Sequence, residues 1–168
     1  MPSIRIGDRI ISLQTMPYVI AEIGVNHGGS LDKALELIDL AQEGGADAVK
    51  FQTYKAETLA SKNSPSYWDL SQEPTTSQYE LFKKYDRFGQ REYELAAEHC
   101  HRKGIHFLST PFDEQAVNFL APLMPCFKVA SADITNLPLL RQVAAKGKPV
   151  LLSTGAATLE RLTWQWPS

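Results

Sequence analysis

The chain has 168 residues, of which 43% are hydrophobic and 21% charged, and its formal net charge is -2. This is the composition of an ordinary globular domain, and the small net charge argues against nucleic acid or an anionic membrane surface as a partner. The two cysteines, Cys100 and Cys126, lack metal-type spacing, and we find neither a signal peptide nor an apolar run that could span a bilayer. We therefore expect a cytoplasmic protein that acts on a small molecule.

Residues 1–17 alternate apolar and polar side chains around a glycine, which predicts a two-stranded β-ribbon ahead of a main domain at 18–168. The apolar run Tyr18–Ile23 then predicts a buried strand, and the glycines behind it allow a tight turn into a helix that Ser30 can cap. Chemistry in open sheets and βα barrels lies at such strand ends. The side chains expected there are Glu22, Asn26 and His27.

Four more strands are predicted, each following a helical pattern or a long loop. They are Ala48–Thr53, His106–Thr110, Phe127–Ser131 and Val150–Gly155. Because βα crossovers are right-handed, consecutive units of this kind build one parallel sheet with all strand ends on one rim. The fold class is therefore α/β.

The segment from Tyr54 to Phe88 interrupts this regular order with prolines, serines and recurring aromatic residues. A long ordered loop that leaves a strand end is more often functional than idle, so we interpret it as a lid or pocket wall. In the alternative interpretation the aromatic residues only pack the loop against the domain, with Gln78–Tyr85 as one short helix.

Two lysines, Lys50 and Lys128, fall inside predicted strands near the rim. A charge in a strand buried on both faces is costly unless it meets an opposite charge, so we expect an anion between the two lysines. Hydroxyl groups could complete a cradle for a phosphate or carboxylate. The hydroxyl residues are Thr110, Ser131 and Ser153. No nucleotide-binding glycine loop is present, which favours a compact phospho-acid.

Each candidate residue has a structural alternative. Lys50 and Lys128 could instead form ion pairs with Glu22 and Asp133 that only shape the interior. His27 could fix the turn as readily as contact a substrate. The remaining histidines are interpreted as surface or packing residues, with no metal-type spacing, and they are His99, His101 and His106.

Five short motifs stand in a fixed order along the chain. They are Ala21–Gly24 with Asn26, His27 and Gly29, then Lys50–Gln52, Ser109–Asp113, Phe127–Ser131 and Ser153–Gly155. Together they closely resemble the N-terminal barrel of the N-acetylneuraminate (sialic acid) synthase family, over about residues 1 to 160. This family includes the legionaminate and pseudaminate synthases. The resemblance implies a TIM-type (β/α)8 barrel followed by a small antifreeze-like domain, in a homodimer.

The resemblance also implies a reaction, the condensation of phosphoenolpyruvate with N-acetylmannosamine or a related aldose. Carbon 3 of phosphoenolpyruvate attacks the aldehyde, water adds at carbon 2, and phosphate leaves. By the matching motifs we expect catalytic roles for Glu22, Lys50, Lys128 and Asp133. We expect substrate-binding roles for Asn26, His27, Gln52, Thr110, Ser131 and Ser153. Legionaminate-type, pseudaminate-type or other phosphoenolpyruvate-dependent sugar-acid synthesis is the alternative.

A complete (β/α)8 barrel needs roughly 250 residues, and only about the first five βα units are recognisable here. In the family, a divalent metal, Mn²⁺ or Mg²⁺, activates the aldehyde and is held by histidines of later strands, so we assign no metal ligand in this chain. The tail 162–168 is rich in tryptophan and departs from the family pattern. A non-catalytic, truncated half-barrel is therefore a further alternative.

Overall fold

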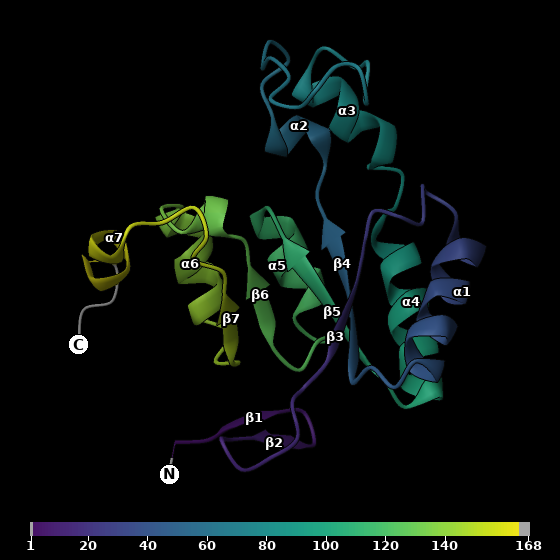
Figure 1. Ribbon diagram of the computed structural model, residues 1–168, viewed down its shortest axis with the longest axis vertical. Coiled ribbons are helices and arrows are strands. Elements are labelled where there is room, and N and C mark those ends of the chain that lie inside the picture. Colours follow the sequence, from purple (N-terminus) through teal and green to yellow (C-terminus); the bar gives the residue numbers. More distant parts are fainter. Residues whose placement is uncertain (1, 165–168) are drawn as a thin grey trace.

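The computed structural model describes residues 2–164. The chain opens with β1 (Ile4–Ile6) and β2 (Arg9–Ile11), which pair antiparallel, so the expected β-ribbon is present. Figure 1 shows this ribbon across one end of the molecule, away from α2 and α3. Residues 165–168, the end of the atypical tail, lie outside the described residues.

Three parallel strands in the order β3-β4-β5 carry most of the candidate residues. The strands are β3 (Ile20–Gly24), β4 (Ala48–Thr53) and β5 (His106–Pro111). Glu22 pairs in register with Lys50, and Gln52 pairs with Thr110. Lys50 and Gln52 are partly exposed between buried neighbours, so their side chains share one face of the sheet. A parallel α/β sheet is confirmed.

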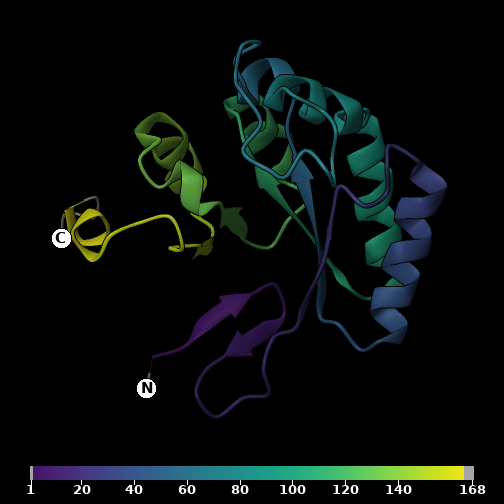
Figure 2. The ribbon, with the colours of Figure 1, turned by 45° about the horizontal axis from the view of Figure 1, so that its top comes forward.

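Two helices cover the outer face of this sheet, as Figures 1 and 2 show: α1 (Leu31–Glu43) and α4 (Gln90–Lys103). The Ser30 hydroxyl accepts a hydrogen bond from the Lys33 amide at 3.3 Å and caps α1 as expected. The buried face of α4 is made of apolar residues at helical spacing. It consists of Tyr93, Ala96, Ala97 and Cys100.

One hydrophobic core joins these helices to the strands. Its largest buried side chains include Phe51 and Phe127, and the ring of Phe51 stacks on that of Phe107 at 5.5 Å. Both cysteines are free and buried. Within residues 2–164, no helix is long and apolar enough to cross a membrane.

The second half of the sheet departs from the prediction. Its elements are α5 (Glu114–Leu120), β6 (Phe127–Val129), the 3-10 helix η1 (Ser131–Asp133), α6 (Leu137–Ala144), β7 (Val150–Leu152) and α7 (Leu159–Trp164). β6 and β7 pair in parallel, and β6 lies beside β5 without joining its ladder. The Ser109 amide of β5 instead donates to Met124 Sδ at 2.9 Å. The continuous sheet expected from the sequence is therefore interrupted between β5 and β6, and β7 ends before Ser153.

Residues 55–88 form a separate body above β4, which we call the β4–α4 segment (Figure 1). It contains α2 (Ala56–Leu59), which was not predicted, and α3 (Gln78–Tyr85), the helix of the alternative interpretation. Its two ends are tied together, because Lys55 Nζ donates to the carbonyl oxygens of Asp86 and Phe88, both at 2.8 Å. The Ala56 amide also donates to the Asp86 carboxylate at 2.9 Å.

Candidate functional site

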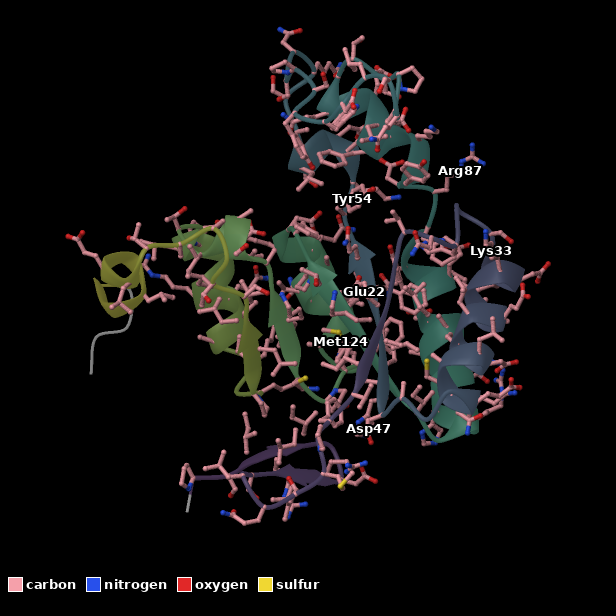
Figure 3. The ribbon with its side chains drawn as sticks, in the orientation of Figure 1. Glu22, Lys33, Asp47, Tyr54, Arg87 and Met124 are labelled. Atoms are coloured by element: carbon pink, nitrogen blue, oxygen red, sulfur yellow. The ribbon has the colours of Figure 1, made fainter. Side chains whose placement is uncertain are left out.

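Glu22 and Lys50 form an ion pair at the centre of the β3-β4 ladder. Lys50 is the more buried partner, with 13% of its side chain exposed against 49% for Glu22. Figure 3 shows Glu22 in the middle of the strands. A Cβ atom at Gly24 would lie 3.2 Å from Glu22 Oε1 and 3.6 Å from Gln52 Nε2, so both side chains converge on this glycine. The structure thus brings Glu22, Lys50 and Gln52 together as expected.

Lys128, on β6, lies within electrostatic range of this pair. Its ammonium group donates to the Val129 carbonyl oxygen at 2.9 Å. Burial lowers the pKa of Lys128 most, the nearby Lys50 ammonium lowers it further, and the Glu22 carboxylate opposes both effects. Glu22 pairs with Lys50 and only acts on Lys128 through its field, so a local excess of positive charge remains, which favours an anion.

The structural alternative for the lysines holds for only one of them. Lys50 pairs with Glu22, but the described part of the chain shows no ion pair between Lys128 and Asp133. Asp133 lies in η1 and accepts a 3.3 Å hydrogen bond from Asn136 Nδ2. Burial raises the pKa of the Asp133 carboxyl, and the hydrogen bond from Asn136 partly opposes this. A carboxyl with a raised pKa is suited to proton transfer.

The predicted hydroxyl residues lie at three neighbouring strand ends. Thr110 is buried in β5 beside Ser109, whose hydroxyl contacts that of Thr53 at 2.6 Å. Ser131 opens η1 directly after β6. The Ser153 amide donates to the Val129 carbonyl at 3.1 Å, and the Lys128 ammonium group shares that acceptor. Ser131 therefore follows β6, the strand that carries Lys128, and Ser153 follows the neighbouring strand β7.

His27 is almost fully buried in the β3–α1 turn. The Gly29 amide donates to His27 Nδ1 at 3.2 Å, and the ring packs at a tilt of 34° against Phe88 with centroids 3.9 Å apart. Burial lowers the pKa of His27 to about 4, so the ring is neutral at physiological pH. These contacts favour the turn-fixing interpretation of His27. Its Nε2 has no hydrogen-bond partner among the described residues.

Asn26 lines a groove that the sequence did not reveal. The groove has a volume of about 640 Å³ and lies between the β3–α1 turn and the β4–α4 segment. Its lining consists of Val25, Asn26, Gly28, Lys33, Tyr67, Trp68, Glu73, Leu81 and Tyr85. The β4–α4 segment is therefore a pocket wall, as its recurring aromatic residues suggested, but no sequence signal linked it to Lys33.

Potential metal ligands do not cluster in the described part of the chain. Across residues 2–164, no group of three or more His, Cys, Asp or Glu side chains is placed to hold a metal ion. The residues around Lys50 and Lys128 are suited to an anion instead.

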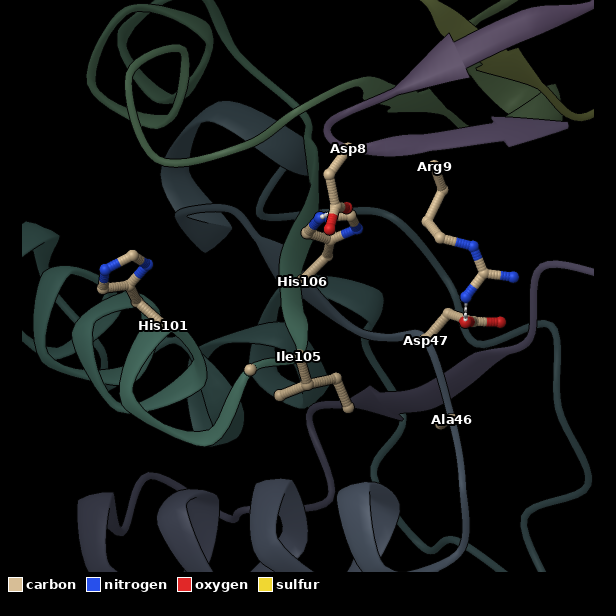
Figure 4. A pocket seen from close by; sticks show the side chains of 8 residues that line it. Asp8, Arg9, Ala46, Asp47, His101, Ile105 and His106 are labelled. Carbon is tan, nitrogen blue, oxygen red and sulfur yellow. Dashed lines mark hydrogen bonds and ion pairs between the residues drawn. The ribbon is translucent and has the colours of Figure 1, made fainter.

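A second pocket, of about 440 Å³, lies at the opposite end of the strands, under the β-ribbon (Figure 4). Its charged groups are mostly paired with one another. Arg9 pairs with Asp47, and His106 Nε2 lies 3.2 Å from the Asp8 carboxylate. His106 Nδ1 also contacts the Tyr18 hydroxyl at 2.6 Å. We interpret this cluster as a clasp that holds the ribbon in place, because the amino-terminal end of such strands serves stability.

Replacing Asp47 with alanine is expected to lower the free energy of unfolding by about 1–2 kcal/mol, because it leaves two donors without their acceptor. These donors are the Arg9 guanidinium and the Val19 amide, which donates to Asp47 Oδ2 at 2.7 Å. Urea unfolding measures the change. The matched control is Glu98→Ala, whose exposed ion pair with Arg102 should contribute little. If both variants lose the same free energy of unfolding, Asp47 does not hold the ribbon in place.

Comparison with known proteins places these residues in a family context. Residues 37–165 match the NeuB family. An uncharacterized protein of Methanocaldococcus jannaschii is 41% identical over 98% of this chain and 45% of its own length. The N,N'-diacetyllegionaminic acid synthase of Legionella pneumophila is 41% identical over 86% of this chain and 41% of its own length.

The fold agrees with these matches. The crystal structure of an N-acetylneuraminic acid synthetase from Leptospira borgpetersenii superposes with a TM-score of 0.84 at 34% identity, and covers 98% of this chain and 53% of that one. The chain spans less than half the length of the curated relatives it matches. The arrangement of β3 to β7 is thus part of a barrel seen in full-length relatives.

Proposed function

We propose that this chain, which belongs to the NeuB family of sialic acid synthases, takes part in condensing phosphoenolpyruvate with an N-acetylmannosamine-type aldose. The products would be a nonulosonic acid and phosphate. A cytoplasmic location and a homodimer belong to the same proposal. The curated relatives include legionaminic, pseudaminic and N-acetylneuraminate-9-phosphate synthases, which supports the synthesis of a sugar acid in general.

One observation carries the proposal: the ammonium groups of Lys50 and Lys128 lie within electrostatic range of each other and of the Glu22 carboxylate, which forms an ion pair with Lys50 alone. Phosphoenolpyruvate carries a phosphate and a carboxylate, and can take the place of the missing negative charge. Hydroxyl groups at the adjacent strand ends, on Ser131 and Ser153, can donate hydrogen bonds to its oxygen atoms. The arrangement supports a compact dianionic or trianionic substrate.

In this mechanism Lys50 and Lys128 hold phosphoenolpyruvate and stabilise the charge that develops as phosphate leaves. Glu22 and Gln52, which converge beside Gly24, orient the aldose so that its aldehyde faces carbon 3 of phosphoenolpyruvate. Asp133, whose carboxyl has a raised pKa, exchanges the proton that water addition at carbon 2 requires. A divalent metal, Mn²⁺ or Mg²⁺, would activate the aldehyde when bound, held by ligands outside the described residues, in which no cluster of potential ligands occurs.

Two measurements on the purified chain test the proposal. Calorimetric titration with phosphoenolpyruvate measures binding to the lysine pair, and phosphate release with Mn²⁺ and N-acetylmannosamine measures turnover. Sugar-dependent phosphate release would establish the full reaction in this chain. Binding without release would support the cradle and leave the chain as a non-catalytic half-barrel. A chain that binds no phosphoenolpyruvate would refute the proposal.

The lowered pKa of Lys128 predicts how binding depends on pH. Binding needs the charged ammonium group, so affinity for phosphoenolpyruvate should fall as pH rises through a pKa below the ordinary lysine value. The Glu22 carboxylate raises this pKa, so in Glu22→Gln the fall should begin at lower pH. Titrations above about pH 7.5 keep the ligand phosphate ionised and isolate the lysine. A decline at the same pH in both proteins would argue against coupling between Glu22 and Lys128.

A further inference from the structure

Met124 accepts a main-chain hydrogen bond that a neighbouring strand would otherwise accept. Its sulfur atom lies 2.9 Å from the Ser109 amide nitrogen, and the residue is buried. Figure 3 shows Met124 at mid-height of the strands, below Glu22. The Lys148 ammonium group donates to the carbonyl oxygens of Met124 and Ala121, so the segment that carries the sulfur atom is fixed to the chain just before β7.

The pattern of hydrogen bonds along β5 shows that the Ser109 amide points toward β6. The His106 and Phe112 amides donate to carbonyl oxygens just before β4 and at its end, at 2.9 and 3.1 Å. Because the N–H groups of a strand alternate between its two edges, Ser109 faces the edge away from β4. Pro111 is the next residue on that edge and has no N–H. Ser109 is therefore the last donor that β5 can offer to β6 at its carboxyl end.

The main chain of Lys128 faces β5 from the other side. The Phe127 amide donates to the Pro149 carbonyl oxygen at 2.9 Å, and the Val129 carbonyl oxygen accepts from the Ser153 amide at 3.1 Å, both on the β7 side. By the same alternation, the amide and carbonyl groups of Lys128 point to β5. In the part of the chain that the structure describes, β5 and β6 share no ladder, so these groups have no strand partner.

Two arrangements therefore compete for the Ser109 amide. In the observed, open arrangement its acceptor is a thioether sulfur atom, which is a weak acceptor. In a closed arrangement a carbonyl oxygen of β6 would accept the amide instead, and β5 and β6 would belong to one sheet. The two strands already lie side by side, so closing needs only a small shift of β6.

An anion bound by both lysines would favour the closed arrangement. Lys50 projects from β4 and Lys128 from β6, so β5 lies between the two strands. In the open arrangement the Lys128 ammonium group turns back to its own strand, where the Val129 carbonyl oxygen accepts it at 2.9 Å. A phosphate or carboxylate that contacts both ammonium groups would attract Lys128 away from Val129 and draw β6 toward β5.

We propose that Met124 is a positioning residue that holds β6 away from β5, and that an anion bound by Lys50 and Lys128 transfers the Ser109 amide to a carbonyl oxygen of β6. The inference rests on the proposed function for the identity of that anion, phosphoenolpyruvate. Closing the sheet opposes binding, so the apparent affinity is lower than the affinity of the closed arrangement.

Met124→Leu tests the role of the sulfur atom, because it removes this acceptor and keeps a side chain of similar volume. The Ser109 amide then has no acceptor in the open arrangement, which raises the closed fraction. We expect phosphoenolpyruvate to bind about threefold to tenfold more tightly in calorimetric titration, since one hydrogen bond no longer favours the open arrangement. The matched control is Met16→Leu, the same change at an exposed position, which should leave the affinity within about twofold.

Nuclear magnetic resonance observes the closing itself. In the wild-type protein without ligand, the Ser109 amide proton should show no nuclear Overhauser effect to main-chain protons of β6. Saturating phosphoenolpyruvate should produce this effect, and Met124→Leu should produce it without ligand. If Met124→Leu does not fold, the comparison of the wild-type protein with and without phosphoenolpyruvate decides the proposal.

The outcomes separate the role of Met124 from the proposed function. If phosphoenolpyruvate binds the wild-type protein, an unchanged or lower affinity in Met124→Leu overturns the role of Met124 while the site at Lys50 and Lys128 stands. A Ser109 amide that stays remote from β6 with phosphoenolpyruvate bound also overturns it. If phosphoenolpyruvate does not bind, the proposed function fails. The ligand-free spectra then decide alone, and a Ser109 contact with β6 in Met124→Leu but not in the wild-type protein supports the role of Met124.

Discussion

Replacing Lys128 with methionine should weaken phosphoenolpyruvate binding at least about a hundredfold, because truncating one member of a desolvated charge pair costs 2–5 kcal/mol or more. Lys128 supplies one of the two ammonium groups, and its partial burial reduces screening by water. Methionine keeps most of the side-chain volume, so packing around Val129 is preserved. Calorimetric titration at neutral pH measures the loss.

Lys146→Met is the matched control for Lys128→Met. Lys146 follows α6, at the opposite end of β7 from Ser153, and its ammonium group contacts the Asn118 side chain at 2.7 Å. Its replacement removes the same charge from the protein and should leave phosphoenolpyruvate affinity within about twofold, because charges beyond a Debye length are largely screened. Retained affinity in Lys128→Met would reduce Lys128 to a structural residue.

Gly29→Ala should lower the free energy of unfolding by about 2–5 kcal/mol, because it combines two penalties. The backbone φ of Gly29 is +82°, a left-handed conformation that costs other residues about 1–2 kcal/mol. A Cβ atom would also lie 2.6 Å from Arg87 Cδ and 2.8 Å from Arg87 Cβ, and relieving such overpacking costs about 1–3 kcal/mol. Urea unfolding measures the sum.

Gly45→Ala separates the two penalties. Gly45 has a similar φ of +79°, but no atom lies within 4 Å of the added Cβ. Gly45→Ala should therefore lower the free energy of unfolding only by the backbone penalty of about 1–2 kcal/mol. If both variants lose the same amount, the contact between the β3–α1 turn and Arg87 is not a tight one.

Much of the fold follows from local patterns. β4 has the predicted bounds, and Ser30, Asp113 and Asn136 cap helices as their side chains suggest. Periodicity and capping depend on neighbours in the sequence, which is why they can be read directly from it. The interruption between β5 and β6 was not predicted, since tertiary contacts such as the one between the Ser109 amide and the Met124 sulfur atom leave no local pattern in the sequence.

The candidate site was partly predictable for a similar reason. A lysine inside an apolar strand signals an unusual environment, so Lys50 and Lys128 were found from the sequence. The sequence did not predict which partner each lysine would have. It allowed an ion pair for both lysines, but among the described residues only Lys50 forms one. The groove was missed because Lys33 and Tyr67 are far apart in the chain and each is unremarkable alone.

The hydrogen bonds of Lys55 have a consequence for how new specificities could arise. These bonds join the two ends of the β4–α4 segment. Residues 56–85 are therefore connected to the strands and helices of the sheet at a single place. The segment can therefore be exchanged as a cassette between homologous barrels, with Lys55 and Asp86 as the junction. Such exchange would alter the aromatic wall of the groove and leave Lys50 and Lys128 untouched, so under the proposed function acceptor choice and phosphoenolpyruvate binding could evolve separately.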